Sequence, residues 1–263
     1  MPHQSVSELL QRLPGMGGAC LVEQLAHGPT NASYLVERDA ERWVLRLDKA
    51  EARVLGLDRA NERIVCEAIA TAGLTPPYRY FEGAEGVSLR PFIAGRSLRR
   101  DDLLEPRTLQ RLADVLRRLH RLPPVGAGFD VAGAVHRYAA QLATPQAAAL
   151  AEQAAALLAE IGHYSRSPAL CHNDLVAENI LQTAQGDLLL IDWEYAALGD
   201  PYFDLAVVVR HHELSDLLAH ALLSAYLEGA DGEQARLHLH LQCDFYSCLL
   251  ALWNLRVGPV NPA

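Results

Sequence analysis

The 263-residue sequence lacks the features that mark membrane-spanning, secreted and nucleic-acid-binding proteins. It has no apolar stretch of about 18 residues, so we expect no membrane-spanning helix. Its first twenty residues lack a basic start followed by an apolar run, so we expect no secretory signal. Basic residues number 23 against 32 acidic ones, and the formal net charge of −9 disfavours nucleic acid as a default partner.

Metal-binding patterns of cysteine and histidine are also missing. The five cysteines have no zinc spacing and are odd in number, which favours buried free thiols in a reducing compartment and hence a cytoplasmic protein. The histidines late in the chain match no closed zinc set, and we expect solvated helix faces to explain them. They are His211, His212, His238 and His240. The composition thus agrees with an intracellular enzyme, and its acidic balance favours a cationic substrate.

Three polar residues between positions 174 and 192 carry the strongest chemical signal. Asp174 is followed five residues later by Asn179, and Asp192 stands thirteen residues further on, at the end of an apolar run. This spacing suits phosphoryl transfer from a metal nucleotide, in which one Asp receives the acceptor's proton while the Asn and the second Asp hold Mg²⁺. Each residue alone could simply cap a turn or begin a strand. Together they predict a kinase.

The local pattern predicts how these three side chains come together. Short apolar runs over 179–182 and 188–191 flank the turn 184–187, which indicates a β-hairpin. Because a hairpin folds its ends back on each other, Asp174, Asn179 and Asp192 are expected to converge.

The rest of the chain divides into a strand-rich part and a helical part. Strands are predicted over 19–26, 33–37, 42–47, 78–81 and 87–93, with helices over 5–13 and 57–72. Further along, helices are predicted over 106–121, 145–161, 215–227 and 233–255, and another opens at 204.

These motifs resemble the aminoglycoside phosphotransferase and choline kinase superfamily, most of all its bacterial choline/ethanolamine kinases and thiamine kinases. The likeness rests on three strings: His172-Asn173-Asp174 with Asn179, Ile191-Asp192-Trp193-Glu194-Tyr195, and Gly199-Asp200-Pro201 with Phe203-Asp204. It implies an α+β, two-lobed, protein-kinase-like fold that uses ATP and Mg²⁺. A β-rich nucleotide lobe would span 1–92, and a mainly helical catalytic and substrate lobe 93–263. Glu178 departs from the Gly usual in relatives. Since Gly is permissive in backbone angle, a locally altered catalytic loop is expected.

The resemblance also implies nucleotide contacts near the N-terminus. The segment 28–34 resembles the phosphate-covering loop, which makes Thr30, Asn31 and Ser33 candidates, although an ordinary hairpin turn is the alternative. The segment 90–95 resembles the connector between lobes, where the backbone of Phe92 and Ile93 would bind the adenine edge.

A cation over the phosphates is implied as well. Arg46 lies in an alternating strand and resembles this cation, with Arg in place of the usual Lys. Glu62, on the following helix, is its expected partner and Glu67 the competing one. Elsewhere we expect scaffold roles. His172 would brace the catalytic loop, Asp204 would bond to that loop, and His120 would act as a hydrogen-bond hub.

The acceptor pocket is the least defined part of the sequence. A quaternary ammonium group is bound by aromatic faces and nearby carboxylates, which makes Trp193, Glu194, Tyr246 and Trp253 candidates, with core packing as the alternative for each aromatic. We expect a kinase for the hydroxyl of a small cationic metabolite such as choline, with ethanolamine or thiamine next. Alternatives are an aminoglycoside or sugar phosphotransferase and a catalytically silent nucleotide-binding protein. Neither nucleic acid nor a membrane is expected as a partner.

Overall fold

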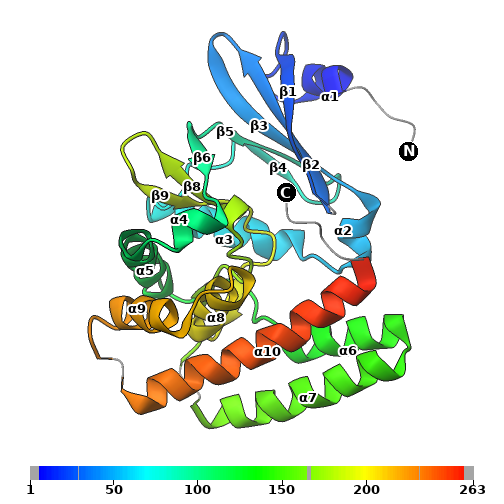
Figure 1. Ribbon diagram of the computed structural model, residues 1–263. Coiled ribbons are helices and arrows are strands. Elements are labelled where there is room, and N and C mark those ends of the chain that lie inside the picture. Colours follow the sequence, from blue (N-terminus) through cyan, green and yellow to red (C-terminus); the bar gives the residue numbers. More distant parts are fainter. Residues whose placement is uncertain (1–5, 29, 165–166, 231, 258–263) are drawn as a thin grey trace. The chain divides into compact units, whose positions relative to one another are not determined.

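The computed structural model describes residues 6–28, 30–164, 167–230 and 232–257. The chain forms two compact units, and their helices and strands are labelled in Figure 1. The first comprises Met1–Gly95 together with Asp192–Tyr195, and the second comprises Arg96–Ile191 and Ala196–Ala263. Four residues from the second half of the sequence therefore belong to the N-terminal unit. Among the described residues, no helix is long and apolar enough to cross a membrane.

The N-terminal unit is built on a five-stranded antiparallel sheet with strand order β1-β2-β3-β5-β4. Its strands are β1 (Cys20–His27), β2 (Asn31–Arg38), β3 (Glu41–Asp48), β4 (Tyr80–Glu82) and β5 (Val87–Pro91). Buried side chains such as Val36, Leu45 and Leu89 project from neighbouring strands into one core, where Leu10 and Met16 join them. The period-2 pattern of the sequence thus identified these strands, with ends shifted by at most two residues.

Three helices accompany this sheet: α1 (Val6–Arg12), α2 (Ala50–Val54) and α3 (Arg59–Thr71). Helix α3 begins where Asp58 accepts a hydrogen bond from the Asn61 N–H at 2.9 Å, an N-cap that satisfies one backbone donor of the first turn. Its buried face carries Glu62, Val65 and Ile69. A charged residue, Glu62, therefore lies on the same face of the helix as the apolar ones, where it pairs with Arg46 on β3.

The C-terminal unit is mainly helical. Its α-helices are α4 (Arg100–Leu103), α5 (Pro106–His120), α6 (Val131–Leu142), α7 (Pro145–Ile161), α8 (Pro201–His211), α9 (Asp216–Tyr226) and α10 (Glu233–Val257). The long α10 packs against α6, α7 and α8, and α5 packs against α9 (Figure 1). The sequence predicted α5, α7, α9 and α10 with nearly these bounds but missed α6. That segment contains Gly133 and many alanines and has weak apolar periodicity. It begins because Asp130 caps it through the Gly133 N–H.

Short strands in this unit position the catalytic loop. Strands β6 (Gly95–Ser97), β8 (Ile180–Thr183) and β9 (Leu188–Leu190) form one sheet in the order β6-β8-β9. Strands β7 (Ala169–Cys171) and β10 (Ala197–Gly199) form an antiparallel pair. Strands β8 and β9 pair with Ile180 opposite Leu190, so the predicted hairpin is confirmed.

Candidate active site

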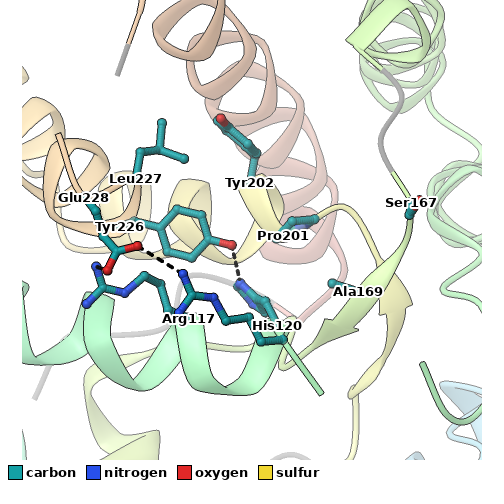
Figure 2. Close-up of a pocket in the computed structure, with 10 residues that line it drawn as sticks. Arg117, His120, Ser167, Ala169, Pro201, Tyr202, Tyr226, Leu227 and Glu228 are labelled. Atoms are coloured by element: carbon teal, nitrogen blue, oxygen red, sulfur yellow. Dashed lines mark hydrogen bonds and ion pairs between the residues drawn. The ribbon is translucent and has the colours of Figure 1, made fainter. Parts of the chain in front are cut away.

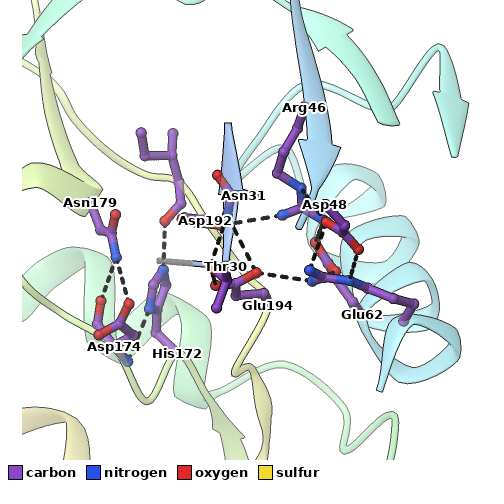
Figure 3. Close-up of polar contacts among 12 residues, drawn as sticks. Thr30, Asn31, Arg46, Asp48, Glu62, His172, Asp174, Asn179, Asp192 and Glu194 are labelled. Carbon is purple, nitrogen blue, oxygen red and sulfur yellow. Dashed lines mark hydrogen bonds and ion pairs between the residues drawn. The ribbon is translucent and has the colours of Figure 1, made fainter. Parts of the chain in front are cut away.

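The proposed base lies in the loop that follows β7. The Asn179 amide nitrogen donates to both the backbone carbonyl and the Oδ2 of Asp174, each at 2.9 Å (Figure 3). This amide nitrogen is therefore committed to Asp174, and the Asn179 amide oxygen is the atom that can face a cation. Asn173 adopts a left-handed conformation with φ 65°, which Asn tolerates better than most residues. The loop thus presents a carboxylate and an amide oxygen in a fixed relation.

Glu178 fits this loop without backbone strain. It lies in the short 3₁₀ turn Ala177–Asn179, which is right-handed, and its carbonyl accepts a hydrogen bond from the Ser97 hydroxyl at 3.0 Å. The side chain is exposed. The structure therefore gives no conformational reason for a Gly at this position, and a carboxylate here changes the charge of the loop rather than its path.

His172 braces the loop through both ring nitrogens. Its Nε2 donates to the Ile191 carbonyl at 2.9 Å, and its Nδ1 accepts the Asp174 N–H at 3.3 Å. A ring that donates from one nitrogen and accepts at the other is neutral imidazole. His172 therefore holds the backbone carbonyl of Ile191, the residue that immediately precedes the proposed metal ligand Asp192 in the chain.

Asp204 of α8 holds the same loop from below. Its two carboxylate oxygens accept the N–H groups of His172 at 2.8 Å and Asn173 at 2.7 Å. Oδ2 also bonds to His120 Nε2 at 3.0 Å, and His120 Nδ1 bonds to the Tyr226 hydroxyl at 2.9 Å. The scaffold roles expected of His120 and Asp204 match these contacts.

A cavity of about 310 Å³ in the C-terminal unit borders this hydrogen-bond chain (Figure 2). His120 and Tyr226 line it, together with Arg117, Arg121 and Glu228. Both guanidinium groups pair with the Glu228 carboxylate, Arg117 at 3.4 Å and Arg121 at 3.0 Å. Arg117 also pairs with Asp114, so two carboxylates of the protein balance the two guanidinium charges at the cavity wall.

The N-terminal unit contains a dense cluster of arginines and carboxylates (Figure 3). Arg46 on β3 pairs with Glu62 at 2.6 Å and with Asp192 at 3.2 Å. Glu67 instead pairs with the exposed Arg63. Burial lowers the pKa of Arg46, but the nearby carboxylates, Glu62 first, outweigh it and leave this pKa well above its ordinary value. Arg46 is thus a permanent buried cation beside the proposed metal ligand, whose backbone is left-handed at φ 64°.

A second arginine in this cluster was missed by sequence reasoning. Arg59 holds Asp48 with a two-pronged contact of 2.7 and 2.8 Å, and reaches Glu62 at 2.6 Å and Glu194 at 3.0 Å. Such forked contacts are the strong form of the arginine–carboxylate pair. The spacing of three residues between Arg59 and Glu62 on one helix was the only available signal. Asp48 offered none.

Glu194 is fastened by the loop that was expected to cover phosphates. The Thr30 hydroxyl donates to its Oε1 at 2.7 Å, and the Asn31 amide lies 3.5 Å from its Oε2. Burial, with the Asp192 carboxylate adding to it, raises the pKa of Glu194 to about 7. Glu194 and Trp193 are only 7 % and 3 % exposed, so neither side chain offers much surface to an acceptor in this structure.

Two other predicted nucleotide contacts are also placed in the sheet region. Ser33 lies on β2, half-buried, opposite Arg46 in the strand register. The Phe92 N–H donates to the Arg42 carbonyl at 2.9 Å, which extends the pairing of β5 with β3. A nucleotide contact from Phe92 would therefore use its carbonyl oxygen. Ile93 is the next residue after this last pairing of β5 with β3.

Aromatic side chains gather near Asp174 within the C-terminal unit. The Tyr246 hydroxyl bonds to His211 Nδ1 at 3.2 Å, and the Trp253 ring lies 5.9 Å from that of Tyr138 on α6. Burial, reinforced by the negative charge of Asp174, raises the pKa of Tyr246. Burial also raises the pKa of Tyr138, against the opposing charges of Arg256 and Arg137 and with a smaller contribution from Asp174. The negative charge of the proposed base thus acts on both hydroxyls. Tyr138 was missed because a lone tyrosine in an alanine-rich helix belongs to no motif.

The expectation of solvated histidines was wrong for two of the four. His212 and His238 are each only 2 % exposed. His212 donates to the Leu175 carbonyl at 3.1 Å, and His238 bonds to Asp200 at 2.6 Å while its ring stacks on Tyr202. These contacts join residues far apart in sequence, which a spacing rule cannot detect. The cysteines also include one surprise, because Cys20 is exposed whereas the other four are buried.

Comparison with known proteins supplies the family. The profile of the group described as "Phosphotransferase enzyme family" matches residues 21–238. Protein LicA of Haemophilus influenzae is 31% identical over 206 residues, which cover 75% of this chain and 76% of that protein. Another LicA sequence from the same species is also 31% identical over 208 residues, and there the match covers 76% of this chain but spans only 60% of the relative's length. The chain belongs to the phosphotransferase enzyme family.

Solved structures agree with this assignment. A choline/ethanolamine kinase family protein from Mesorhizobium loti has a TM-score of 0.78 at 23% identity, over 97% of this chain and 87% of that one. Choline kinase LicA from Streptococcus pneumoniae has a TM-score of 0.74 at 21% identity, over 92% and 89%. The predicted α+β, protein-kinase-like fold is confirmed, as is the resemblance drawn from the motifs. The chain is thus a member of the phosphotransferase enzyme family with a protein-kinase-like fold.

Proposed function

We propose that this protein is an ATP-dependent kinase that phosphorylates the hydroxyl of a small cationic alcohol, choline first and ethanolamine or thiamine next. The observation that carries the proposal is the Asp174–Asn179 pair, held by His172 and by the Asp204 carboxylate. The LicA relatives support choline as the first acceptor to test, since one of them is titled a choline kinase.

In the proposed reaction, Asp174 accepts the proton of the acceptor hydroxyl while the acceptor oxygen bonds to the γ-phosphorus and the bond from that phosphorus to ADP breaks. His172 and Asn179 keep the carboxylate in place during this step. Arg46, fixed by Glu62, neutralises charge on the phosphates. Positioning and electrostatic stabilisation supply most of the acceleration in reactions of this type.

The oxygen donors suit magnesium. The Asn179 amide oxygen and the Asp192 carboxylate are hard ligands, the kind that Mg²⁺ prefers together with phosphate oxygens and water. We propose these two residues as its protein ligands. When bound with ATP, the ion neutralises the charge that develops on the transferred phosphoryl group. Thr30, Asn31, Ser33 and the backbone at Phe92 and Ile93 stay proposed nucleotide contacts.

For the acceptor site we propose Tyr246 and Trp253, joined by Tyr138. These side chains offer aromatic faces, and Asp174 in the same unit offers a negative charge. Both suit an ammonium group. Trp193 and Glu194 stay candidates as well, and both are buried, as is Tyr246. The free thiols support a reducing, cytoplasmic location, which we also propose.

The test is a turnover panel with Mg²⁺ and ATP over choline, ethanolamine, thiamine, a sugar and an aminoglycoside. We expect phosphorylation of choline above the others, and Asp174→Asn is expected to lower kcat by about 10²- to 10⁴-fold. Asp187→Asn, an exposed aspartate in the β8–β9 turn, is the matched control and should retain activity. Tight ATP binding without turnover of any acceptor would refute the proposal, and preference for the aminoglycoside or the sugar would refute the choice of acceptor.

A further inference from the structure

The aromatic pair of the proposed acceptor site already carries a cation that belongs to the protein. The Tyr138 and Trp253 ring centroids are 5.9 Å apart with their planes inclined by 56°. The Arg256 guanidinium carbon lies 5.7 Å from the Tyr138 centroid and 5.9 Å from the Trp253 centroid. These distances are within the range over which a cation is attracted to a ring face. One guanidinium therefore uses both rings at once.

This guanidinium is also tethered. Arg256 Nε donates to the Gln141 amide oxygen at 2.8 Å, so one hydrogen bond links α10 to α6 beside the rings. Tyr138, Trp253 and Arg256 are each half-buried, and Gln141 is exposed. Arg256 stands three residues after Trp253 on the same helix, on the side chain row that runs along one face. It is thus held over the rings but remains close enough to solvent to move away.

Tyr138 also lies in the electric field of the proposed base. The charge of Asp174 acts on the hydroxyl of Tyr138 and also on that of Tyr246. An ammonium group bound at Tyr138 and Trp253 would therefore be attracted by Asp174 as well as by the rings.

We propose that Arg256 is a competing cation that occupies the ammonium position of the acceptor site, must be displaced by a cationic acceptor and so sets the affinity of the site for it. This inference rests on the proposed function, because it assigns the aromatic pair to the acceptor. Two cations cannot share one pair of ring faces, since each repels the other at a few ångströms. The affinity for a cationic acceptor is therefore the difference between its attraction to the site and that of Arg256.

Every cationic acceptor that binds at the ring pair has to displace Arg256. An acceptor whose cation is fully methylated cannot replace the hydrogen bond that Arg256 makes to Gln141, but it gains the larger apolar contact with the rings. A primary ammonium gains less ring contact and pays the same displacement. Arg256 therefore lowers the affinity for every cationic acceptor by the same displacement cost, and the ring contacts decide the preference among these acceptors.

Arg256→Gln is the direct test. It removes the competing charge but keeps a polar side chain near Gln141. We expect the KM for choline to fall about fivefold to tenfold with kcat unchanged, the range that loss of one competing cation–π contact implies. Arg137→Gln is the matched control, because Arg137 lies next to Tyr138 on α6 but pairs with Asp130 at 3.4 Å and is exposed. Its KM for choline should stay within twofold or so of the wild-type value.

A second measurement separates this inference from the proposed function. Tetramethylammonium has the cation of choline but no hydroxyl, so calorimetric titration reports its binding without any turnover. It should bind Arg256→Gln more tightly than wild type, and Gln141→Ala, which removes only the tether, should shift affinity in the same direction by less. Failure of every acceptor in the turnover panel would refute the proposed function while this titration still tests Arg256.

Three outcomes would overturn the inference. Unchanged tetramethylammonium affinity in Arg256→Gln would mean that the guanidinium does not compete for the site. Weaker binding or a raised KM would mean that Arg256 supports the acceptor rather than opposing it. Equal tightening in Arg256→Gln and Arg137→Gln would reduce the effect to general removal of positive charge.

Discussion

At the scale of single residues, Glu62 shows how strongly a buried carboxylate depends on its partners. Its side chain is fully buried and bonds to Arg46 and Arg59, each at 2.6 Å. Glu62→Gln replaces the buried carboxylate that both guanidinium groups share with a neutral amide, so we expect the free energy of unfolding to fall by about 3 kcal/mol. The KM for ATP should rise as well, because Arg46 loses the group that orients it.

Glu67→Gln is the natural comparison for this prediction. Glu67 lies on the same helix and pairs with Arg63, but both side chains are more than 60 % exposed. The change is expected to alter stability by no more than about 0.5 kcal/mol. Urea unfolding of both variants checks the pair, and similar losses for the two would contradict the assignment of Glu62 as the buried anchor.

His212 gives a pH dependence with a defined sign. Burial lowers the pKa of His212 from 6.5 to about 4. Above pH 6.5 the ring is neutral in both the folded and the unfolded chain, so this group contributes no loss. Between pH 6.5 and 4 the unfolded chain takes up a proton that the folded protein does not. Stability is therefore lost as pH falls, by about 3 kcal/mol from this group at pH 4.

His212→Gln tests this dependence. The Gln amide can still donate to the Leu175 carbonyl, so the fold is retained while the titrating group is removed. Unfolding free energies measured from pH 7 to pH 4 should decline less steeply in the variant than in wild type. His136→Gln, which removes an exposed histidine on α6, is the control. A variant slope as steep as that of wild type would place the acid sensitivity elsewhere.

At the scale of elements, the β2–β3 hairpin turns through two residues that are not glycine. Asp39 and Ala40 have φ of 51° and 65° between the paired residues Arg38 and Glu41. Both central positions of such a turn need positive φ, which Gly adopts without strain and Ala does not. Ala40→Gly should therefore stabilise the N-terminal unit by about 0.5 to 1 kcal/mol, the relief of strain less the added entropy of the unfolded chain.

The sign of this effect distinguishes it from a general response to glycine. Ala140 is an exposed residue inside α6, where the same substitution should cost about 1 kcal/mol. Thermal unfolding of the two variants is expected to move in opposite directions. A loss of stability in Ala40→Gly would mean that the unfolded-state entropy outweighs the strain.

The predictability of elements followed the strength of their local signals. Helices α5 and α7 have Pro at their first position and a clear end, and both were predicted nearly to the residue. Helix α6 and the short strands β7 and β10 were missed. A three-residue strand carries no periodicity, and α6 forms because α7 and α10 pack against it. Its existence thus depends on tertiary contacts that no local window contains.

At the scale of the whole molecule, the segment 192–195 joins the N-terminal unit through contacts with residues far away in sequence. Arg46 reaches Asp192 across 146 positions, and Thr30 reaches Glu194 across 164. The boundary predicted at residue 92 stays a prediction. The segment that carries a proposed metal ligand belongs to the N-terminal unit, so nucleotide and metal should act on the stability of that unit.

Ligand-linked stability tests this idea on the intact protein. With Mg²⁺ and ATP at about 100 times the dissociation constant, the free energy of unfolding should rise by about 2.7 kcal/mol. Removal of the metal with EDTA should abolish part of that gain. In Asp192→Asn the gain from ATP should be the same with and without Mg²⁺, whereas Asp187→Asn should behave as wild type. A metal-dependent gain that survives Asp192→Asn would remove Asp192 from the metal site.

The sequence by itself determined the family, the order of the main elements and the positions of Asp174, Asn179 and Asp192, because these are encoded in local periodicity and in short fixed spacings. Only the tertiary structure decided the places of Arg59, Tyr138 and Arg256. Each acts through a partner on another element, such as Glu194, which lies 135 positions from Arg59. Contacts of that kind depend on how helices and strands pack, and packing is decided by the whole chain rather than by any segment of it.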